Sequence, residues 1–123
     1  SMKMPVSEIV DRYTITLLKS ERTDEDVQEE LQCYWNEIKS YDTNLNEYIE
    51  SLYIANGKLW DTEGDIRKGG AGLPLEEIGR LALQVRDLNC DRNAIKAELV
   101  EKFAEGFKEL KINYAKRDYG KNN

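Results

Sequence analysis

The stretch LWDTEGDIRKGGAGLPLEEIGRL, residues 59–81, decides the fold, because it ends one long helix and begins another. Three glycines between positions 69 and 72 are poor helix formers and end the first helix. Pro74 suits the first position of the next helix, and Glu76 and Glu77 suit its positive end. A connection this short predicts two long helices that lie antiparallel to each other.

Apolar residues recur at steps of three and four on both sides of this turn, which predicts helices over residues 44–68 and 75–104. The expected inward stripe of the first helix is Leu45, Ile49, Leu52, Asn56, Leu59, Glu63 and Ile66. The expected stripe of the second is Ile78, Leu81, Val85, Leu88, Arg92, Ile95 and Leu99. Both stripes contain polar residues, and these become candidates for a site.

Two shorter helices are predicted upstream. Ser7 is a good N-cap for a helix over residues 7–21, in which Ile9 or Val10, Tyr13 and Leu17 recur at helical spacing. Thr23 and the acidic residues after it resemble a second helix start. The apolar seam of that second helix is Val27, Leu31, Tyr34, Ile38, Tyr41 and Leu45, interrupted near residues 42–44.

These elements predict an all-α fold, an antiparallel helical bundle of three to four long helices with a short C-terminal segment. A chain of 123 residues suits one hydrophobic core. We therefore expect one domain over residues 2–114, in which residues 107–114 dock on the bundle. Residues 115–123 are basic and polar and are expected to form a flexible tail. Long helices with abundant tyrosine also favour a homodimer.

Composition excludes several classes of function. The net charge of -6 opposes attraction to phosphates, so a nucleic-acid partner is disfavoured. No apolar run approaches the roughly 20 residues of a membrane helix, and no signal-peptide pattern occurs, so we expect a cytoplasmic protein without a membrane partner. The chain has no histidine, which excludes Cys/His zinc sites and histidine-based catalysis. Cys33 and Cys90 are expected to be buried thiols, and a disulfide between them is the alternative.

The polar residues on the two inward stripes need partners, because stranding them in a core costs roughly 1 to 3 kcal/mol each. Antiparallel packing predicts a buried pair between Glu63 and Arg92, braced by Asn56 or Asn89. Two interpretations stay open. The network either fixes helix register, or it forms a polar cleft for an anionic or hydroxyl-rich ligand, with Arg92 as bidentate donor and Trp60 as a stacking wall. The candidate ligand-binding residues are Asn56, Trp60, Glu63, Arg67, Asn89, Asp91, Arg92 and Lys96.

The sequence matches two known metal-binding motifs, but each of them only in part. Residues 87–98 place oxygen ligands at calcium-loop positions, but Arg92 stands where the loop needs glycine. Glu47 and Glu50 have the Glu-x-x-Glu spacing of the all-α nucleotide pyrophosphatases, but their Glu-x-x-Asp half is missing. The alternative function is therefore a divalent-metal-dependent hydrolase of nucleotides or sugar-phosphates, and no catalytic residue, metal ligand or cofactor is assigned.

Four blocks carry a resemblance to a known family: PVSEIVDRYTITLLKSER from residue 5, LYIANGKLWDTEGDIRKG from 52, RLALQVRDLNCDRNAIKAEL from 80 and ELKINY from 109. Together they resemble a family of small bacterial proteins catalogued as a domain of unknown function, which includes phage relatives. The departures are Arg12 and Tyr13 in place of Lys-Ile, and Cys90 between Asn89 and Asp91. The family's motif positions fall on Asn56, Leu59, Trp60, Glu63, Ile66, Arg67, Asn89, Asp91, Arg92 and Lys96.

Members of this family sometimes accompany sugar-transfer proteins, so the resemblance implies an accessory role in glycan assembly. The first hypothesis is therefore a non-catalytic binding or accessory protein. Its partner is a small polar ligand or another protein, which binds at the cleft. The metal-dependent hydrolase is the second hypothesis. Thermal melting with divalent metals, nucleotides and nucleotide sugars separates the two, because a ligand that binds the native state stabilises it.

Overall fold

The structure is a computed structural model that describes residues 4–104. Its elements in chain order are α1 (Val6–Arg22), α2 (Gln28–Lys39), α3 (Asn46–Gly69), the short 3-10 helix η1 (Gly70–Gly72) and α4 (Leu75–Phe103). The prediction of an all-α helical bundle is confirmed. The expected docking segment 107–114, the domain boundary at 114 and the tail 115–123 lie outside the described residues.

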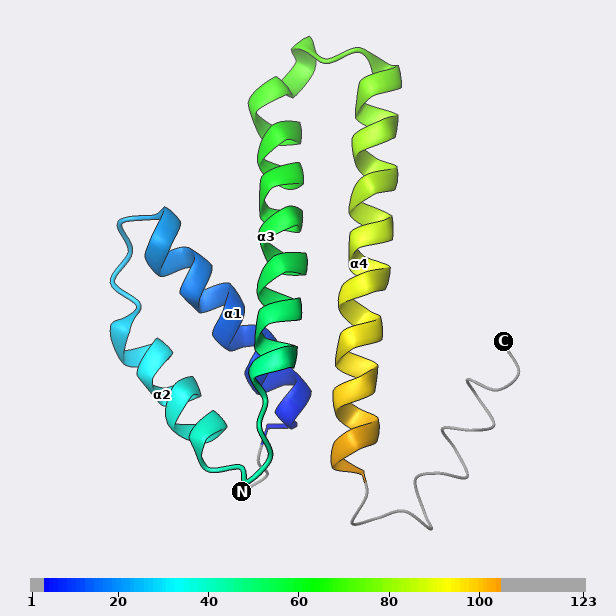
Figure 1. The fold of residues 1–123 in the computed structure, drawn as a ribbon. Coiled ribbons are helices and arrows are strands. Elements are labelled where there is room, and N and C mark those ends of the chain that lie inside the picture. The colour runs from blue at the N-terminus through cyan, green and yellow to red at the C-terminus, as the bar shows by residue number, and fades with distance from the viewer. Residues whose placement is uncertain (1–3, 105–123) are drawn as a thin grey trace, which may run out of the picture.

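Two antiparallel helix pairs make up the fold (Figure 1). The long helices α3 and α4 lie side by side and are joined through η1, as the glycines and Pro74 predict. The shorter helices α1 and α2 form the second pair, in which α1 packs obliquely against α3 and also contacts α4. In Figure 1, α1 and α2 lie beside the half of the α3–α4 pair that is farther from η1.

The hydrophobic core lies where α1 meets this half of the long pair. Val10, Leu52 and Leu99, from α1, α3 and α4, are completely buried. The core cluster consists of Val6, Ile9, Val10, Ile38, Leu45, Leu52 and Leu99. Its edge is closed by aromatic side chains that contact one another. One such pair is Tyr41 and Phe103, whose ring centroids are 5.2 Å apart in an edge-to-face arrangement.

The start of α2 differs from the sequence expectation. It begins at Gln28, and the polar residues after α1 form a connection instead of a first turn. Thr23 Oγ1 donates a hydrogen bond to the Lys19 carbonyl oxygen (2.8 Å) and accepts one from the Glu25 amide (3.2 Å). Thr23 therefore closes the end of α1, because short hydroxyl side chains bond to nearby backbone groups at either end of a helix.

Both cysteines are free and exposed, so the prediction of buried thiols is wrong. Cys33 and Cys90 lie off the apolar stripes of α2 and α4, and a residue between two stripe positions faces outward on a helix. None of the helices within residues 4–104 has the length and apolar composition needed to span a bilayer.

Two glycines near the end of α3 should respond to alanine in opposite ways. Gly70 has φ of 48° and ψ of -138°, a conformation that side chains disfavour, so Gly70→Ala should lower the free energy of unfolding by about 1 to 3 kcal/mol. Gly64 lies inside α3, and an added Cβ would meet no atom within 4 Å. Gly64→Ala should therefore raise the free energy of unfolding by about 0.5 to 1 kcal/mol. Urea unfolding measures both, and changes of the same sign would contradict the turn geometry.

Candidate functional site

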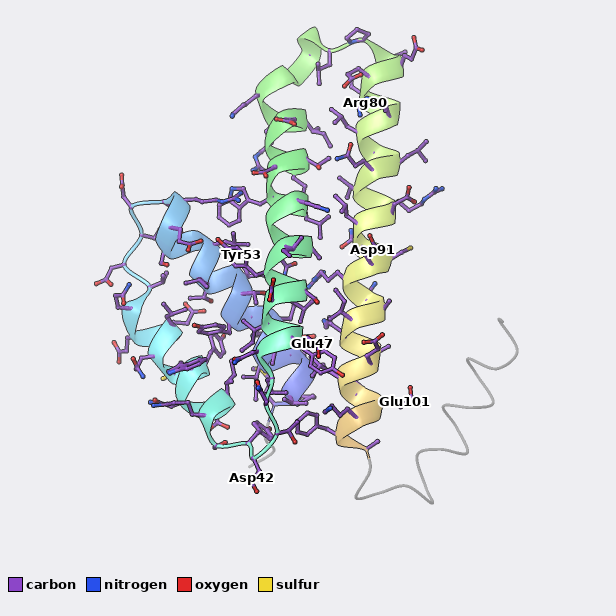
Figure 2. The ribbon with its side chains drawn as sticks, in the orientation of Figure 1. Asp42, Glu47, Tyr53, Arg80, Asp91 and Glu101 are labelled. Atoms are coloured by element: carbon purple, nitrogen blue, oxygen red, sulfur yellow. The ribbon has the colours of Figure 1, made fainter. Side chains whose placement is uncertain are left out.

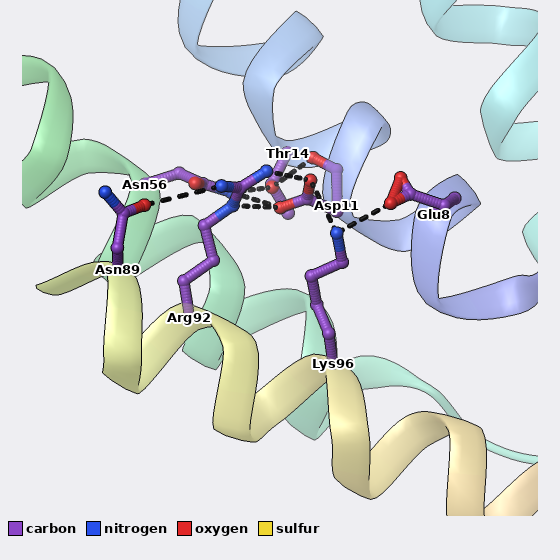
Figure 3. Close-up of polar contacts among 7 residues, drawn as sticks. All are labelled: Glu8, Asp11, Thr14, Asn56, Asn89, Arg92 and Lys96. Carbon is purple, nitrogen blue, oxygen red and sulfur yellow. Dashed lines mark hydrogen bonds and ion pairs between the residues drawn. The ribbon is translucent and has the colours of Figure 1, made fainter.

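A buried ion pair between α1 and α4 is the centre of the polar interior (Figure 3). The side chain of Asp11, in α1, is 2% exposed. The Arg92 guanidinium, from α4, donates from Nε to Asp11 Oδ1 (3.0 Å) and from Nη2 to Asp11 Oδ2 (2.7 Å). This bidentate geometry is the strongest that an arginine and a carboxylate form, and it fixes both side chains in one plane.

Helix α3 joins the same network through Asn56. Its Nδ2 donates to Asp11 Oδ1 (3.0 Å) and to Thr14 Oγ1 (2.9 Å). The Thr14 hydroxyl in turn donates to the backbone carbonyl oxygen of Asp11 (2.7 Å). All three side chains are buried. A single carboxylate therefore connects three helices, and its hydrogen bonds replace the water that it loses on burial.

Two further residues of α4 extend the network. Lys96 Nζ lies 2.6 Å from Glu8 Oε1 and 3.7 Å from Asp11 Oδ2, so it bridges two acidic residues of α1. Asn89 Oδ1 accepts a long hydrogen bond from Arg92 Nη1 (3.5 Å). Asn89, Arg92 and Lys96 lie one turn apart on the same side of α4, as Figure 3 shows.

The network holds both members of the ion pair in their charged forms. Burial alone would raise the pKa of Asp11, but the hydrogen bonds from Arg92 and Asn56 and the charges of Arg92 and Lys96 outweigh burial and lower it. The hydrogen bond to Asp11 raises the pKa of Arg92 against the effect of burial, and the negative charges of Asp11, Glu8 and Glu63 raise it further.

The predicted pair between Glu63 and Arg92 is wrong. Glu63 is exposed and acts on Arg92 only through its charge, and Asp11 of α1 is the residue that binds the guanidinium. Sequence reasoning missed Asp11 because it assigned the inward face of α1 to its apolar residues. A signal was present: Ser7, Asp11, Thr14 and Leu18 follow one another at steps of four, three and four, and all four are buried.

Most of the predicted residues surround one cavity of about 190 Å³, which lies beside the ion pair. Its lining residues are Ile15, Leu18, Asn56, Leu59, Trp60, Glu63, Asn89 and Arg92. Lys96 belongs to the network but not to the cavity. Arg67 and Asp91 are exposed and belong to neither, so the structure does not bring them to the predicted site.

The lining of the cavity combines hydrogen-bonding side chains with one aromatic ring. Asn56 uses its amide nitrogen within the network, and no described residue donates to its Oδ1. Glu63 supplies a hydrated carboxylate, and Trp60 is half-buried at the wall. Asp11 occupies the Nε–Nη2 edge of Arg92 and neutralises its charge, and Nη1 makes a long hydrogen bond to Asn89. An anionic ligand would therefore gain less attraction from Arg92 than from an unpaired arginine, whereas a hydroxyl-rich ligand can use both donors and acceptors.

No group of three or more acidic or cysteine side chains within residues 4–104 is placed to hold a metal ion. Glu47 and Glu50, the residues with pyrophosphatase spacing, are both exposed on α3. The segment 87–98 that resembles a calcium loop lies within continuous α4, which keeps its oxygen ligands pointing in different directions.

No family model, curated protein or solved structure matches this chain. The resemblance to the small bacterial family thus stays a prediction, and function has to be inferred from the cavity and the network themselves.

Removing Arg92 should cost far more stability than removing Glu63. Arg92→Leu leaves the Asp11 carboxylate buried without its main partner and should lower the free energy of unfolding by about 3 to 5 kcal/mol. Glu63→Ala removes an exposed side chain and should change it by less than about 0.5 kcal/mol. Urea unfolding at neutral pH measures both values. Equal losses would mean that Glu63, and not Asp11, neutralises the arginine.

The Arg92→Leu defect should depend on pH. In the wild type, the lowered pKa of Asp11 contributes stability that is present above about pH 4, near its unfolded value, and lost as pH falls through the folded value. In Arg92→Leu, the hydrogen bond and charge of Arg92 that lower the pKa of Asp11 are gone while burial still acts to raise it, so acidification costs the variant less stability than it costs the wild type. The difference in the free energy of unfolding between the wild type and Arg92→Leu, measured by urea unfolding, should thus shrink from pH 7 to pH 3.

The matched control for this pH series is Arg86→Leu. Arg86 pairs with Asp87 at the surface, where both side chains are 68% exposed. The difference in the free energy of unfolding between Arg86→Leu and the wild type should be small and nearly constant over the same pH range. A gap for Arg92→Leu that does not change with pH would show that Asp11 is not the titrating partner.

Proposed function

We propose that this protein is a non-catalytic binding or accessory protein whose cavity holds a small hydroxyl-rich ligand, such as one sugar ring. The observation that carries the proposal is the lining of the cavity: the Trp60 ring stands beside amide and carboxylate groups, while the neighbouring arginine is neutralised. Sugar rings stack their apolar C–H faces on aromatic rings and exchange hydrogen bonds with such side chains.

The size of the cavity supports a single ring. About 190 Å³ is below the roughly 300 to 1,000 Å³ of pockets that enclose drug-sized ligands. A nucleotide sugar would therefore place only part of itself inside. One ring of a larger glycan could enter while the remainder lies along the surface near Glu63, which is exposed.

The acidic groups at the cavity favour binding over hydrolysis. Glycoside hydrolysis normally uses two carboxyl groups that face each other across the bond, and one of them acts as an acid. Glu63 is the one carboxylate among the described lining residues. Asp11 is held ionised by Arg92 and is enclosed by its partners, which suits a structural anion and not a proton donor.

We infer further that the protein acts in the cytoplasm as a homodimer, and that the ligand belongs to glycan assembly. The family resemblance supports the last point, and the long, exposed face of α4 supports the dimer. The metal-dependent hydrolase of nucleotides or sugar-phosphates is less favoured, since Glu47 and Glu50 are exposed on α3 and no described third acidic or cysteine side chain joins them in a group that could hold a metal ion.

Tryptophan fluorescence offers a direct test. The chain has two tryptophans, so Trp35→Phe leaves Trp60 as the reporter. Titration with monosaccharides, short oligosaccharides and nucleotide sugars, without metal, should give a saturable change in Trp60 emission for at least one sugar. Glu63→Ala in this background should weaken binding about tenfold or more, which corresponds to about 1.4 kcal/mol.

The control variant is Glu47→Ala, which removes an exposed carboxylate from the same helix and should leave the affinity unchanged. Two results would overturn the proposal. One is the absence of any saturable response at millimolar sugar, and the other is a response to nucleotides that requires Mg²⁺ or Mn²⁺, which would favour the hydrolase.

A further inference from the structure

The ion pairs of the network leave one charge at the cavity unbalanced. Arg92 is neutralised by Asp11, which accepts two of its hydrogen bonds. Lys96 is paired with Glu8, at 2.6 Å. The remaining charged residue of the cavity lining is Glu63, whose side chain is exposed. Its carboxylate is in excess over two balanced pairs, so the cavity and its network together carry a net negative charge.

Glu63 is not bound by a basic residue of the described chain. Within residues 4–104, no lysine or arginine nitrogen lies within 4 Å of its carboxylate, and Arg67, one turn farther along α3, stays outside this distance as well. Glu63 acts on the pKa of Arg92 through its charge, but Asp11 holds that arginine. A ligand that brings a positive charge to Glu63 would therefore displace no existing ion pair.

A second acceptor faces the cavity from Asn56. The ionised Asp11 carboxylate only accepts hydrogen bonds, so the amide nitrogen of Asn56 has to face it and the carbonyl oxygen Oδ1 has to point the other way. Every fully buried polar side-chain atom among the described residues has a hydrogen-bond partner. No described residue donates to Oδ1, so this oxygen is open to solvent, which Asn56 meets at the cavity.

The indole ring of Trp60 lines the same cavity. The face of a tryptophan ring attracts cations more strongly than the other aromatic side chains do. Within the described residues, the one cation–π contact is that of Lys102 with Tyr48, so no basic residue there covers Trp60. An aromatic ring, a carboxylate and an amide oxygen are together the groups that bind an ammonium ion.

We propose that the sugar held by this cavity carries a protonated amino group, as an amino sugar without an N-acetyl group does. The proposal rests on the proposed sugar-binding function and adds the class of sugar. The ammonium group binds at the Glu63 carboxylate, the Asn56 oxygen accepts a further hydrogen bond, and the ring packs against Trp60. Asn89 turns its carbonyl oxygen to Arg92, which leaves its amide nitrogen for a hydroxyl of the same ring (Figure 3).

Charge separates this class from other sugars. A sugar acid or a sugar phosphate would place a negative group near Glu63 and be repelled. An N-acetylated sugar replaces the ammonium by a neutral amide, so the carboxylate gains no ion pair. The net charge of -6 on the chain adds a long-range attraction for the cationic sugar, which salt should weaken.

Sugars that share one ring test the ammonium group. In the Trp35→Phe protein, D-glucosamine, D-glucose and N-acetyl-D-glucosamine are titrated against Trp60 emission at about pH 6, where the amino group is protonated. Glucosamine should bind about tenfold more tightly than the other two, which is the combined scale of one exposed ion pair and one cation–π contact. Methylammonium chloride alone should bind more weakly than glucosamine, because it lacks the ring.

A change of charge at one residue tests the role of Glu63. Glu63→Gln keeps the size and the hydrogen-bonding capacity of the side chain, and it should reduce the preference for glucosamine over glucose to about twofold or less. The matched control is Glu47→Gln, which removes an exposed carboxylate near the start of α3, outside the cavity lining, as Figure 2 shows. This control should keep the full preference. Circular dichroism shows whether both variants are folded.

The outcomes separate this inference from the function on which it rests. If glucose binds as tightly as glucosamine, the amino-sugar class is wrong but sugar binding stands. A preference for glucosamine that survives Glu63→Gln would also overturn the inference, because the charge would then be read elsewhere. Methylammonium that binds as tightly as glucosamine, or no saturable response to any of these sugars, would overturn the sugar-binding function as well.

Discussion

The bidentate pair between Asp11 and Arg92 is the interaction on which the arrangement of the helices depends. Apolar packing between α1 and the long helices is non-directional, so several rotations of α1 would bury similar areas. A buried carboxylate allows far less freedom, because it must receive hydrogen bonds in a fixed geometry or carry the full cost of desolvation. Asn56, which also bonds Thr14, donates a further hydrogen bond to the Asp11 carboxylate. Only one rotation of α1 and one position along its axis therefore allow the hydrogen bonds to α3 and to α4 to form together.

The same pair determines the chemistry of the adjacent cavity. Because Asp11 takes the Nε–Nη2 edge of Arg92, the guanidinium lines the cavity with its charge neutralised. Asn56 turns its amide nitrogen toward Asp11 and Thr14, and no described residue donates to its carbonyl oxygen. A network that fixes helix register and a cleft that binds a ligand therefore do not exclude each other, because Asn56 and Arg92 belong to the network and also line the cavity.

Local signals in the sequence predicted the helices well, but they did not predict the contacts between residues far apart in the sequence. The glycines before Pro74 end α3 and start α4 as expected, and helical spacing correctly marked Asn56 as buried. Periodicity shows which face of a helix turns inward, but it does not identify the neighbour. Asp11 and Arg92 are 81 positions apart, and only the oblique path of α1 brings them together. Glu63 continued the stripe of α3, but it is exposed, and its neighbour Thr62 is the buried residue at this level of the helix.

The two sides of α4 have separate roles in this arrangement. Arg92 turns inward to α1, and Cys90, two residues earlier, lies about 200° away around the helix axis, because each residue advances the helix by about 100°. The inward side therefore supplies Asn89, Arg92 and Lys96 to the network and part of the cavity wall, and the Cys90 side takes no part in either. Changes to the Cys90 thiol should thus leave the ion pair and the cavity in place, because no contact of the network passes through that side of the helix.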